Sequence, residues 1–216
     1  MMPLLSATLF AAALMTVTPP RPLSQSAGAS DLDRRVQSFL DRHRNDWHDM
    51  NVPDVDGRTL HQLILKHRYR RAVEIGTSTG HSGIWIAWAL SKTGGKLITI
   101  DIDPRRHGIA VANFREAGLA DYIDARLGDA HEIVPGLKGP IDFVFSDADK
   151  DWYTRYLEAL WPKLRPGGCF TAHNVSSSGM NGISEFLTHV RALPDGETTI
   201  DTSSSAGVSI TYKREP

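Results

Sequence analysis

Short apolar runs alternate with amphipathic stretches along most of the chain. Five runs are rich in β-branched or aromatic residues and predict strands, at residues 72–75, 97–100, 123–127, 141–145 and 168–172. Helical spacing of apolar residues predicts helices at 31–48, 57–66, 81–90, 105–117, 152–164 and 182–191. Strands that alternate with helices in this way are typical of β-α-β crossovers, which build a mostly parallel sheet covered on both faces.

The end of the chain departs from this alternation. Two more strands are predicted at 198–201 and 208–212, and only residues 202–207 join them. Such a connection is too short for a crossover helix, so these strands form a hairpin and the last strand is antiparallel. We therefore expect an α/β fold with a seven-stranded, mostly parallel sheet, an antiparallel last strand and helices on both faces.

Composition fits one globular domain over residues 31–216. Of the 216 residues, 41% are hydrophobic, which is enough to bury a core. Lys and Arg number 24 against 25 Asp and Glu, so there is no basic excess to favour nucleic acid as a partner. The single cysteine, Cys169, excludes an internal disulfide and a cysteine-based zinc site, and its apolar neighbours predict a core position.

Residues 1–30 form a signal-like or disordered leader. An apolar stretch at 4–17 is followed by the small residues Ala27, Gly28 and Ala29, which is typical of an export signal. The stretch is short for a membrane span and no Lys or Arg precedes it. Export or membrane tethering through this leader is one interpretation. The alternative is a cytoplasmic protein in which these residues are an unstructured leader or follow from a start codon assigned too early.

A glycine-rich turn joins the first predicted strand to the following helix. Gly76 and Gly80 allow backbone amides to approach a ligand closely, and the helix N-terminus behind them favours an anionic group. Ser78 lies in the same turn and Ser82 begins the helix. The spacing is G-x-x-x-G, which differs from the G-x-G-x-x-G of dinucleotide-binding turns.

Polar residues also follow the next two strands. Asp101 ends the second strand about 20 residues after Gly80, where an acid can accept hydrogen bonds from both ribose hydroxyls of an adenosine. Asp129 and Ala130 follow the third strand, where we expect the adenine edge. All these positions lie at carboxyl ends of neighbouring strands, the edge at which open α/β sheets bind ligands.

A second polar group follows the fourth and fifth strands. Asp147 and Asp149 come directly after the apolar run at 141–145, and His173 and Asn174 end the strand after it. Because these two strand ends should be neighbours, Asp147, His173 and Asn174 could offer two oxygens and a nitrogen to one divalent cation.

In these segments the chain resembles the cation-dependent O-methyltransferases, the family that includes catechol and caffeoyl-CoA O-methyltransferases. The similar stretches are residues 73–82, 99–103, 141–153, 167–175 and 182–191. The resemblance implies a Rossmann-like methyltransferase fold that binds S-adenosylmethionine. It also implies that Asp147 and Asn174 bind the metal and that Lys150 takes the proton from the substrate hydroxyl. Glu74, Gly76, Ser82 and Asp101 match cofactor contacts, and Asp149 belongs beside them.

Taken together, these arguments predict three sets of site residues. The cofactor contacts are Glu74, Gly76, Ser78, Gly80, Ser82, Asp101, Asp129, Ala130, Asp147 and Asp149. The catalytic residues are Lys150 and His173, and the metal ligands are Asp147, His173 and Asn174.

His173 departs from the family pattern, which has aspartate before the asparagine. Mg²⁺ prefers oxygen ligands, and this change removes a carboxylate from its site. Three alternatives follow: a softer ion such as Mn²⁺, Fe²⁺ or Zn²⁺ bound through the imidazole, a metal-free site with His173 or Lys150 as general base, or a histidine that merely packs near the pocket. The sequence also leaves two roles for Trp152, which could form a wall of the acceptor pocket or pack in the protein.

The function expected is methyl transfer from S-adenosylmethionine to a hydroxyl of a small acceptor such as a phenol. One rival is a degenerate protein of the same fold that binds a ligand without turnover, which the unusual His173 favours. The other is an NAD-dependent oxidoreductase, which the missing G-x-G-x-x-G and the terminal hairpin disfavour. The sequence leaves a homodimer open.

Overall fold

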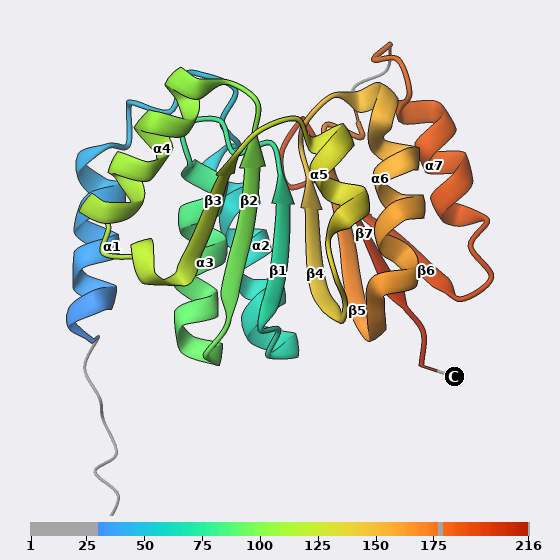
Figure 1. The fold of residues 1–216 in the computed structure, drawn as a ribbon, viewed down its shortest axis with the longest axis horizontal. Coiled ribbons are helices and arrows are strands. Elements are labelled where there is room, and N and C mark those ends of the chain that lie inside the picture. Colours follow the sequence, from blue (N-terminus) through green and yellow to red (C-terminus); the bar gives the residue numbers. More distant parts are fainter. Residues whose placement is uncertain (1–29, 177–178, 216) are drawn as a thin grey trace, which may run out of the picture.

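A computed structural model describes residues 30–176 and 179–215, which form a seven-stranded sheet with helices packed against it (Figure 1). The leader predicted at 1–30 lies outside the described residues except for Ser30. No helix in the described part of the chain is both long and apolar enough to cross a membrane.

The strands follow the order β3-β2-β1-β4-β5-β7-β6. Their bounds are β1 (Arg71–Ile75), β2 (Lys96–Asp101), β3 (Ile123–Leu127), β4 (Ile141–Ser146), β5 (Leu164–His173), β6 (Gly196–Asp201) and β7 (Val208–Lys213). The pairs among β1 to β5 are parallel, and β7 runs antiparallel to both β5 and β6. The predicted seven-stranded sheet with an antiparallel last strand is therefore confirmed.

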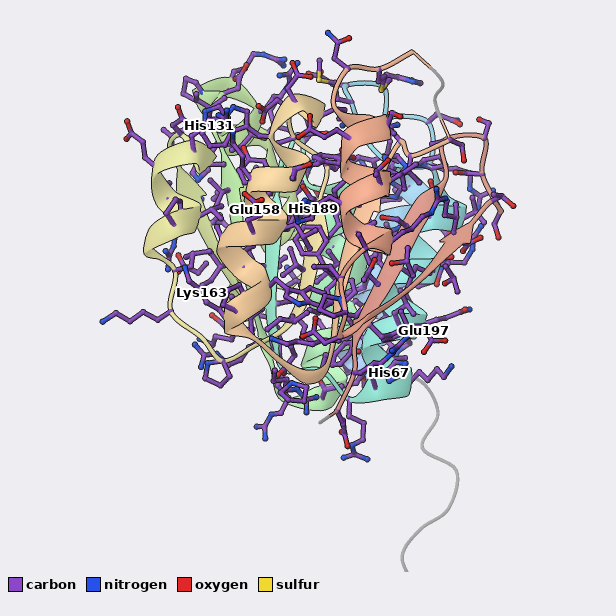
Figure 2. All side chains as sticks on the ribbon, turned by 90° about the vertical axis from the view of Figure 1, so that its right-hand side faces the viewer. His67, His131, Glu158, Lys163, His189 and Glu197 are labelled. Carbon is purple, nitrogen blue, oxygen red and sulfur yellow. The ribbon has the colours of Figure 1, made fainter. Side chains whose placement is uncertain are left out.

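Helices cover both faces of the sheet (Figure 1). They are α1 (Asp31–Arg42), α2 (Asp54–His67), α3 (His81–Thr93), α4 (Pro104–Glu116), α5 (Ala130–Gly136), α6 (Tyr153–Leu160) and α7 (Ile183–Arg191), with short 3-10 turns η1 (Ala120–Tyr122), η2 (Lys150–Trp152) and η3 (Trp161–Lys163). Apolar residues of α2 and α3 pack in one buried cluster, and those of α5, α6 and α7 pack in another. On the second face, His189 of α7 faces Glu158 of α6, with Nε2 3.9 Å from Oε1 (Figure 2).

The central strand β4 shows how the sequence divides between the two faces. Phe143 and Phe145 are fully buried in the α2–α3 cluster, and Val144 is fully buried in the α6–α7 cluster. Successive side chains of a strand point to opposite faces, so a strand covered by helices on both sides is apolar throughout. Cys169 of the neighbouring β5 is buried beside the two phenylalanines, which confirms the core position predicted for it.

Two helices end earlier than the sequence predicts. The helix expected at 31–48 ends at Arg42, because no apolar residue follows Leu40 until Trp47. The helix expected at 152–164 is interrupted: α6 ends at Leu160 and Pro162 falls in η3, where proline cannot continue an α-helix. Trp161 packs in the core there.

One helix was not predicted. The helix α5 is only seven residues long and contains Pro135, so it has too few apolar positions to show a helical period. Its N-terminus is fixed by Asp129, whose side chain accepts a hydrogen bond from the backbone N–H of His131 at 2.8 Å.

Candidate active site

A pocket of about 730 Å³ lies at the carboxyl ends of the parallel strands. It is lined by Met50, Asn51, Gly76, Ser78, Ile100, Asp101, Ile102, Arg106, Asp129, Ala130, His131, Asp147, Ala148, Asp149, Lys150, Tyr156, His173, Asn174 and Met180. Because β2, β1, β4 and β5 are neighbours in the sheet, the residues that end these strands share one cavity. Its size is that of a typical small-molecule site.

The glycine turn after β1 forms the floor of the pocket. Gly76 has a φ of +96°, and a Cβ atom there would lie 2.7 Å from the backbone oxygen of Asp147. The turn therefore packs directly on the end of β4, and only glycine fits. The next residues of the turn are held by Asp101, whose Oδ2 accepts the backbone N–H of Ser78 at 2.7 Å.

Asp101 marks the nucleoside end of the pocket. Its Oδ1 accepts the backbone N–H of Asp103 at 2.9 Å, so backbone amides hold both oxygens in place. Each carboxylate oxygen has a second lone pair, which leaves Asp101 able to accept hydrogen bonds from a ligand diol. Asp129 and Ala130 line the same end, as predicted, and so does the exposed side chain of Ile102.

A loop between α1 and α2 covers this end of the pocket and was not predicted to contribute. Asp49 accepts hydrogen bonds from Arg105 at 2.6 Å and from Arg106 at 2.9 Å. The Nδ2 group of Asn51 donates to Thr79 Oγ1 at 2.7 Å. These contacts place Met50, which is 74% exposed, on the rim of the pocket.

Asp149 connects the pocket to α5 and α6. It accepts a hydrogen bond from the Tyr156 hydroxyl at 3.0 Å and lies 3.0 Å from Nε2 of His131. The indole of Trp152 stacks on the His131 ring with 3.5 Å between centroids, and Trp152 is not among the pocket-lining residues. Trp152 thus packs on a residue that lines the pocket, and His131 and Tyr156 are lining residues that the sequence did not predict.

Lys150, Asp147 and His173 form a connected group at the other end of the pocket. Lys150 Nζ donates to Asp147 Oδ1 at 2.8 Å and to the Ala148 carbonyl at 2.9 Å. Asp147 Oδ2 lies 3.1 Å from Nδ1 of His173. Asn174 follows with a φ of 60°, a left-handed conformation that asparagine adopts more readily than most residues. The neighbouring strand ends thus bring together the polar residues predicted there.

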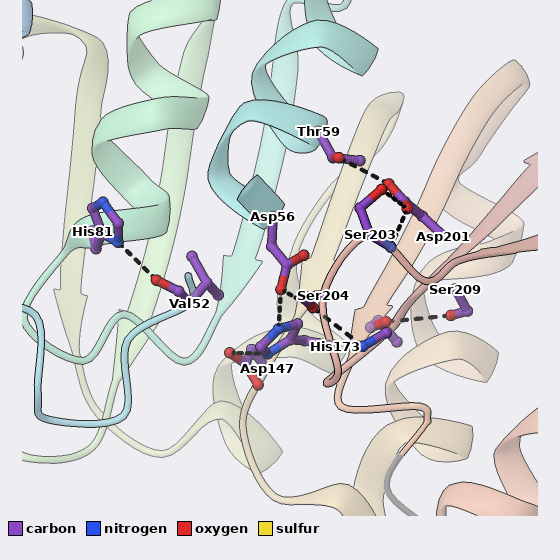
Figure 3. Close-up of polar contacts among 12 residues, drawn as sticks. Val52, Asp56, Thr59, His81, Asp147, His173, Asp201, Ser203, Ser204 and Ser209 are labelled. Carbon is purple, nitrogen blue, oxygen red and sulfur yellow. Dashed lines mark hydrogen bonds and ion pairs between the residues drawn. The ribbon is translucent and has the colours of Figure 1, made fainter. Parts of the chain in front are cut away.

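His173 has a second carboxylate partner that the sequence did not reveal. Its Nε2 lies 2.8 Å from Oδ2 of Asp56, an α2 residue only 1% exposed (Figure 3). Ser204, from the hairpin loop between β6 and β7, donates to the same oxygen at 2.7 Å. Burial alone would lower the pKa of His173, but hydrogen bonds to Asp147 and Asp56 outweigh burial and raise this pKa to about 9. Both carboxylate partners therefore favour the protonated form of the His173 ring.

The residues predicted as metal ligands lie together, but their neighbours do not suit a cation. No group of three His, Cys, Asp or Glu side chains among residues 30–176 and 179–215 is arranged to hold a metal ion. Asp147 already faces Lys150 and His173, which are both basic. Asn174 lines the pocket beside them.

Three of the predicted cofactor contacts lie beneath the pocket. Glu74, Gly80 and Ser82 are not among its lining residues, and Glu74 is completely buried. The Thr99 hydroxyl donates to Glu74 Oε2 at 2.5 Å, while Oε1 has no hydrogen-bond partner within the described structure.

Burial raises the pKa of Glu74 to about 7, assisted by Asp147 and Asp101 and opposed by hydrogen bonds from Ser82 and Thr99. A carboxyl whose pKa is raised on folding stabilises the fold below pH 4.5, and this contribution is lost as the pH rises through about 7. The difference corresponds to about 3 kcal/mol.

We therefore expect Glu74→Gln to flatten the decrease in the free energy of unfolding between pH 5 and pH 8, measured by urea unfolding. Glu197→Gln, at an exposed position of β6, is the matched control and should keep the wild-type pH dependence. An equally steep decrease in the Glu74→Gln variant would contradict the buried, proton-binding role of Glu74.

The amino-acid sequence of this chain is similar to those of several known proteins. The family model described as O-methyltransferase matches residues 25–184. The chain is 37% identical over 134 residues to a catechol O-methyltransferase of Niastella koreensis, covering 60% of each protein. It is 32% identical over 141 residues to caffeoyl-CoA O-methyltransferase 1 of Eucalyptus globulus, covering 63% of the chain and 57% of the relative. The chain thus matches somewhat more than half the length of these curated relatives.

The fold is also similar to that of a solved relative. An O-methyltransferase from Bacillus cereus, solved in complex with SAH, superposes with a TM-score of 0.73 at 27% identity, covering 84% of the chain and 91% of that protein. The family match spans the glycine turn, Asp101, the Asp147–Lys150 segment and the end of β5. The resemblance noted in the sequence is confirmed: this chain belongs to the O-methyltransferase family.

Proposed function

We propose that the protein transfers a methyl group from S-adenosylmethionine to a hydroxyl of a small phenolic acceptor. The observation that carries this proposal is the convergence of the glycine turn, Asp101 and the Asp147–Lys150 pair on one pocket. The catechol and caffeoyl-CoA enzymes that the chain resembles are named for acceptors of this kind. SAH, the demethylated form of the donor, is bound in the Bacillus cereus relative.

The residues at one end of the pocket fit the methyl donor. The close approach at Gly76 keeps the glycine turn free of a side chain where it lines the pocket, and Asp101 has lone pairs free for the two ribose hydroxyls. Apolar Ile102 and Ala130 lie beside it, where a flat adenine ring can pack. When bound, S-adenosylmethionine supplies an electrophilic methyl carbon on a sulfonium.

The residues at the other end can handle the acceptor. The acceptor oxygen forms the new bond to the methyl carbon, and the carbon–sulfur bond breaks with its electron pair left on sulfur. The hydroxyl proton passes to Nζ of Lys150. Lys150 lines the pocket and is held by Asp147 Oδ1 and the Ala148 carbonyl, so its position is fixed before the acceptor binds. Met180, which also lines the pocket, adds an adaptable apolar side chain suited to a planar ring.

Asp101 gives the most direct test of donor binding. Asp101→Ala should weaken the affinity for SAH about 10- to 100-fold in isothermal titration calorimetry, because hydrogen bonds between hydroxyls and a charged acceptor are lost. Asp103→Ala, which removes a neighbouring carboxylate that caps α4 without lining the pocket, is the matched control and should keep wild-type affinity.

Two further results would decide between this function and its rivals. Stabilisation of the wild-type fold by NAD and not by SAH would favour the oxidoreductase. Tight SAH binding without labelled methyl transfer to any of a panel of catechols, hydroxycinnamates and flavonoids would favour a ligand-binding protein without turnover.

A further inference from the structure

The environment of His173 bears directly on whether this site uses a metal. A ring nitrogen binds a metal ion through a lone pair, and a nitrogen that carries a proton has none to offer. Nδ1 of His173 faces a carboxylate oxygen of Asp147, and Nε2 faces one of Asp56. Carboxylates only accept hydrogen bonds, so both nitrogens carry protons and the ring is a cation with no free ligand atom.

The second carboxylate is built into the fold. Asp56 lies in the first turn of α2, and its side chain reaches His173 at the end of β5, 117 residues away in sequence. Ser204 holds the same oxygen from the β6–β7 loop. The His173 side chain is 5% exposed and that of Asp56 is 1% exposed, so water does not compete for this pair.

The basic side chains around Asp147 also argue against a metal ion at this site. Its two oxygens face Lys150 at 2.8 Å and His173 at 3.1 Å, so two basic side chains surround the carboxylate on which a metal would depend. A divalent cation there would have to displace or lie against an imidazolium. Asn174 alone would then supply the remaining protein oxygen, whereas Mg²⁺ sites are usually built on carboxylates.

We propose that Asp56 holds His173 as a fixed imidazolium whose charge takes the place of a divalent cation, so that Asp147, His173 and Asn174 bind no metal. The effect of this imidazolium on catalysis rests on the proposed function. The imidazolium offsets the negative charge of Asp147, which would otherwise oppose the developing charge on the acceptor oxygen. Asp56 is a positioning residue in this arrangement, and His173 serves as a cation while Lys150 accepts the proton.

The first experiment measures metal binding by the full-length protein. After treatment with EDTA, the wild type is titrated with Mn²⁺ and free Mn²⁺ is followed by electron paramagnetic resonance. We expect no saturable binding. The double variant Asp56→Asn/His173→Asp places a carboxylate between Asp147 and Asn174, and it should bind about one Mn²⁺ per chain.

Two outcomes of this titration would overturn the proposal. One is stoichiometric Mn²⁺ binding by the wild type that Asn174→Ala abolishes. The other is absence of binding by the double variant when its thermal melt shows that it is folded, because His173 would then not be what excludes the cation.

The second experiment reads the protonation of His173 directly. In protein labelled with ¹⁵N-histidine, the His173 signals are identified by their loss in His173→Gln. We expect both ring N–H groups at pH 7.5 in the wild type and only one in Asp56→Asn. Ser204→Ala removes a hydrogen bond to Asp56 but leaves its carboxylate, so it is the matched control and should keep both. A neutral ring in the wild type contradicts the proposal.

Activity supplies the third measurement. Methyl transfer should be unchanged by EDTA, and Asp56→Asn should lower kcat about 10-fold or more with little change in the KM for S-adenosylmethionine. EDTA-sensitive turnover that added Mg²⁺ restores would overturn the proposal. If SAH binds but no acceptor is methylated, the proposed function fails, while the Mn²⁺ titration and the ring N–H signals still decide the role of His173.

Discussion

Lys150→Met is expected to lower kcat for methyl transfer about 10²- to 10⁴-fold, the usual contribution of a general base. Methionine keeps the length of the side chain but cannot accept a proton. Lys150 contacts Asp147 and the Ala148 carbonyl at the acceptor end of the pocket, and Asp101 lies at the other end. The affinity for SAH, measured by calorimetry, should therefore change little while labelled methyl transfer is lost.

A second lysine provides the matched control for this experiment. Lys96 is exposed at the start of β2, at the opposite edge of the sheet from the pocket. Lys96→Met should keep wild-type kcat and KM. Near-normal turnover by Lys150→Met would mean that another group takes the proton, and a parallel loss of SAH affinity would mean that the substitution disturbs the whole pocket.

Asp56→Ala is expected to reduce the free energy of unfolding by about 3 kcal/mol at pH 7, measured by urea unfolding. The reason is that the variant leaves the buried His173 imidazolium with Asp147 as its only carboxylate partner. Because the pKa of His173 is raised from 6.5 to about 9 on folding, the stabilisation is complete below pH 6.5 and is lost as the pH rises through 9. The difference between wild type and variant should therefore shrink above pH 9.

Removal of both charges separates this effect from a loss of packing. Asp56→Leu/His173→Phe replaces the pair by apolar side chains of similar volume, and it should be less destabilised than Asp56→Ala despite its extra substitution. Additive losses in the double variant would contradict an ion-pair role, since independent sites add and coupled sites do not.

The sequence predicted the sheet because its signals are local. Strands such as β4 are apolar throughout, and their alternation with helices needs no long-range information. The short link 202–207 forces a hairpin for the same reason. The sequence determined the ends of the helices less well. The helix α5 is too short to show a helical period of apolar residues. The apolar pattern of α6 continues past Leu160, although Pro162 ends the helix there.

The position of the pocket was also accessible from the sequence. Gly76, Asp101, Asp147 and Lys150 each follow or end a predicted strand, and parallel strands place their carboxyl ends at one edge. These residues do line one pocket. The loop containing Met50 and the ring of His131 lie outside such motifs, so only the folded chain brings them to the pocket.

The sequence by itself determined the sheet, the edge at which ligands bind and the unusual histidine at its fifth strand. Only the tertiary structure decided the chemical state of that histidine, because Asp56 and Ser204 come from a distant helix and a distant loop. The pKa of a buried side chain depends on which charges fold against it, and no spacing along the chain encodes a contact between residues 117 positions apart.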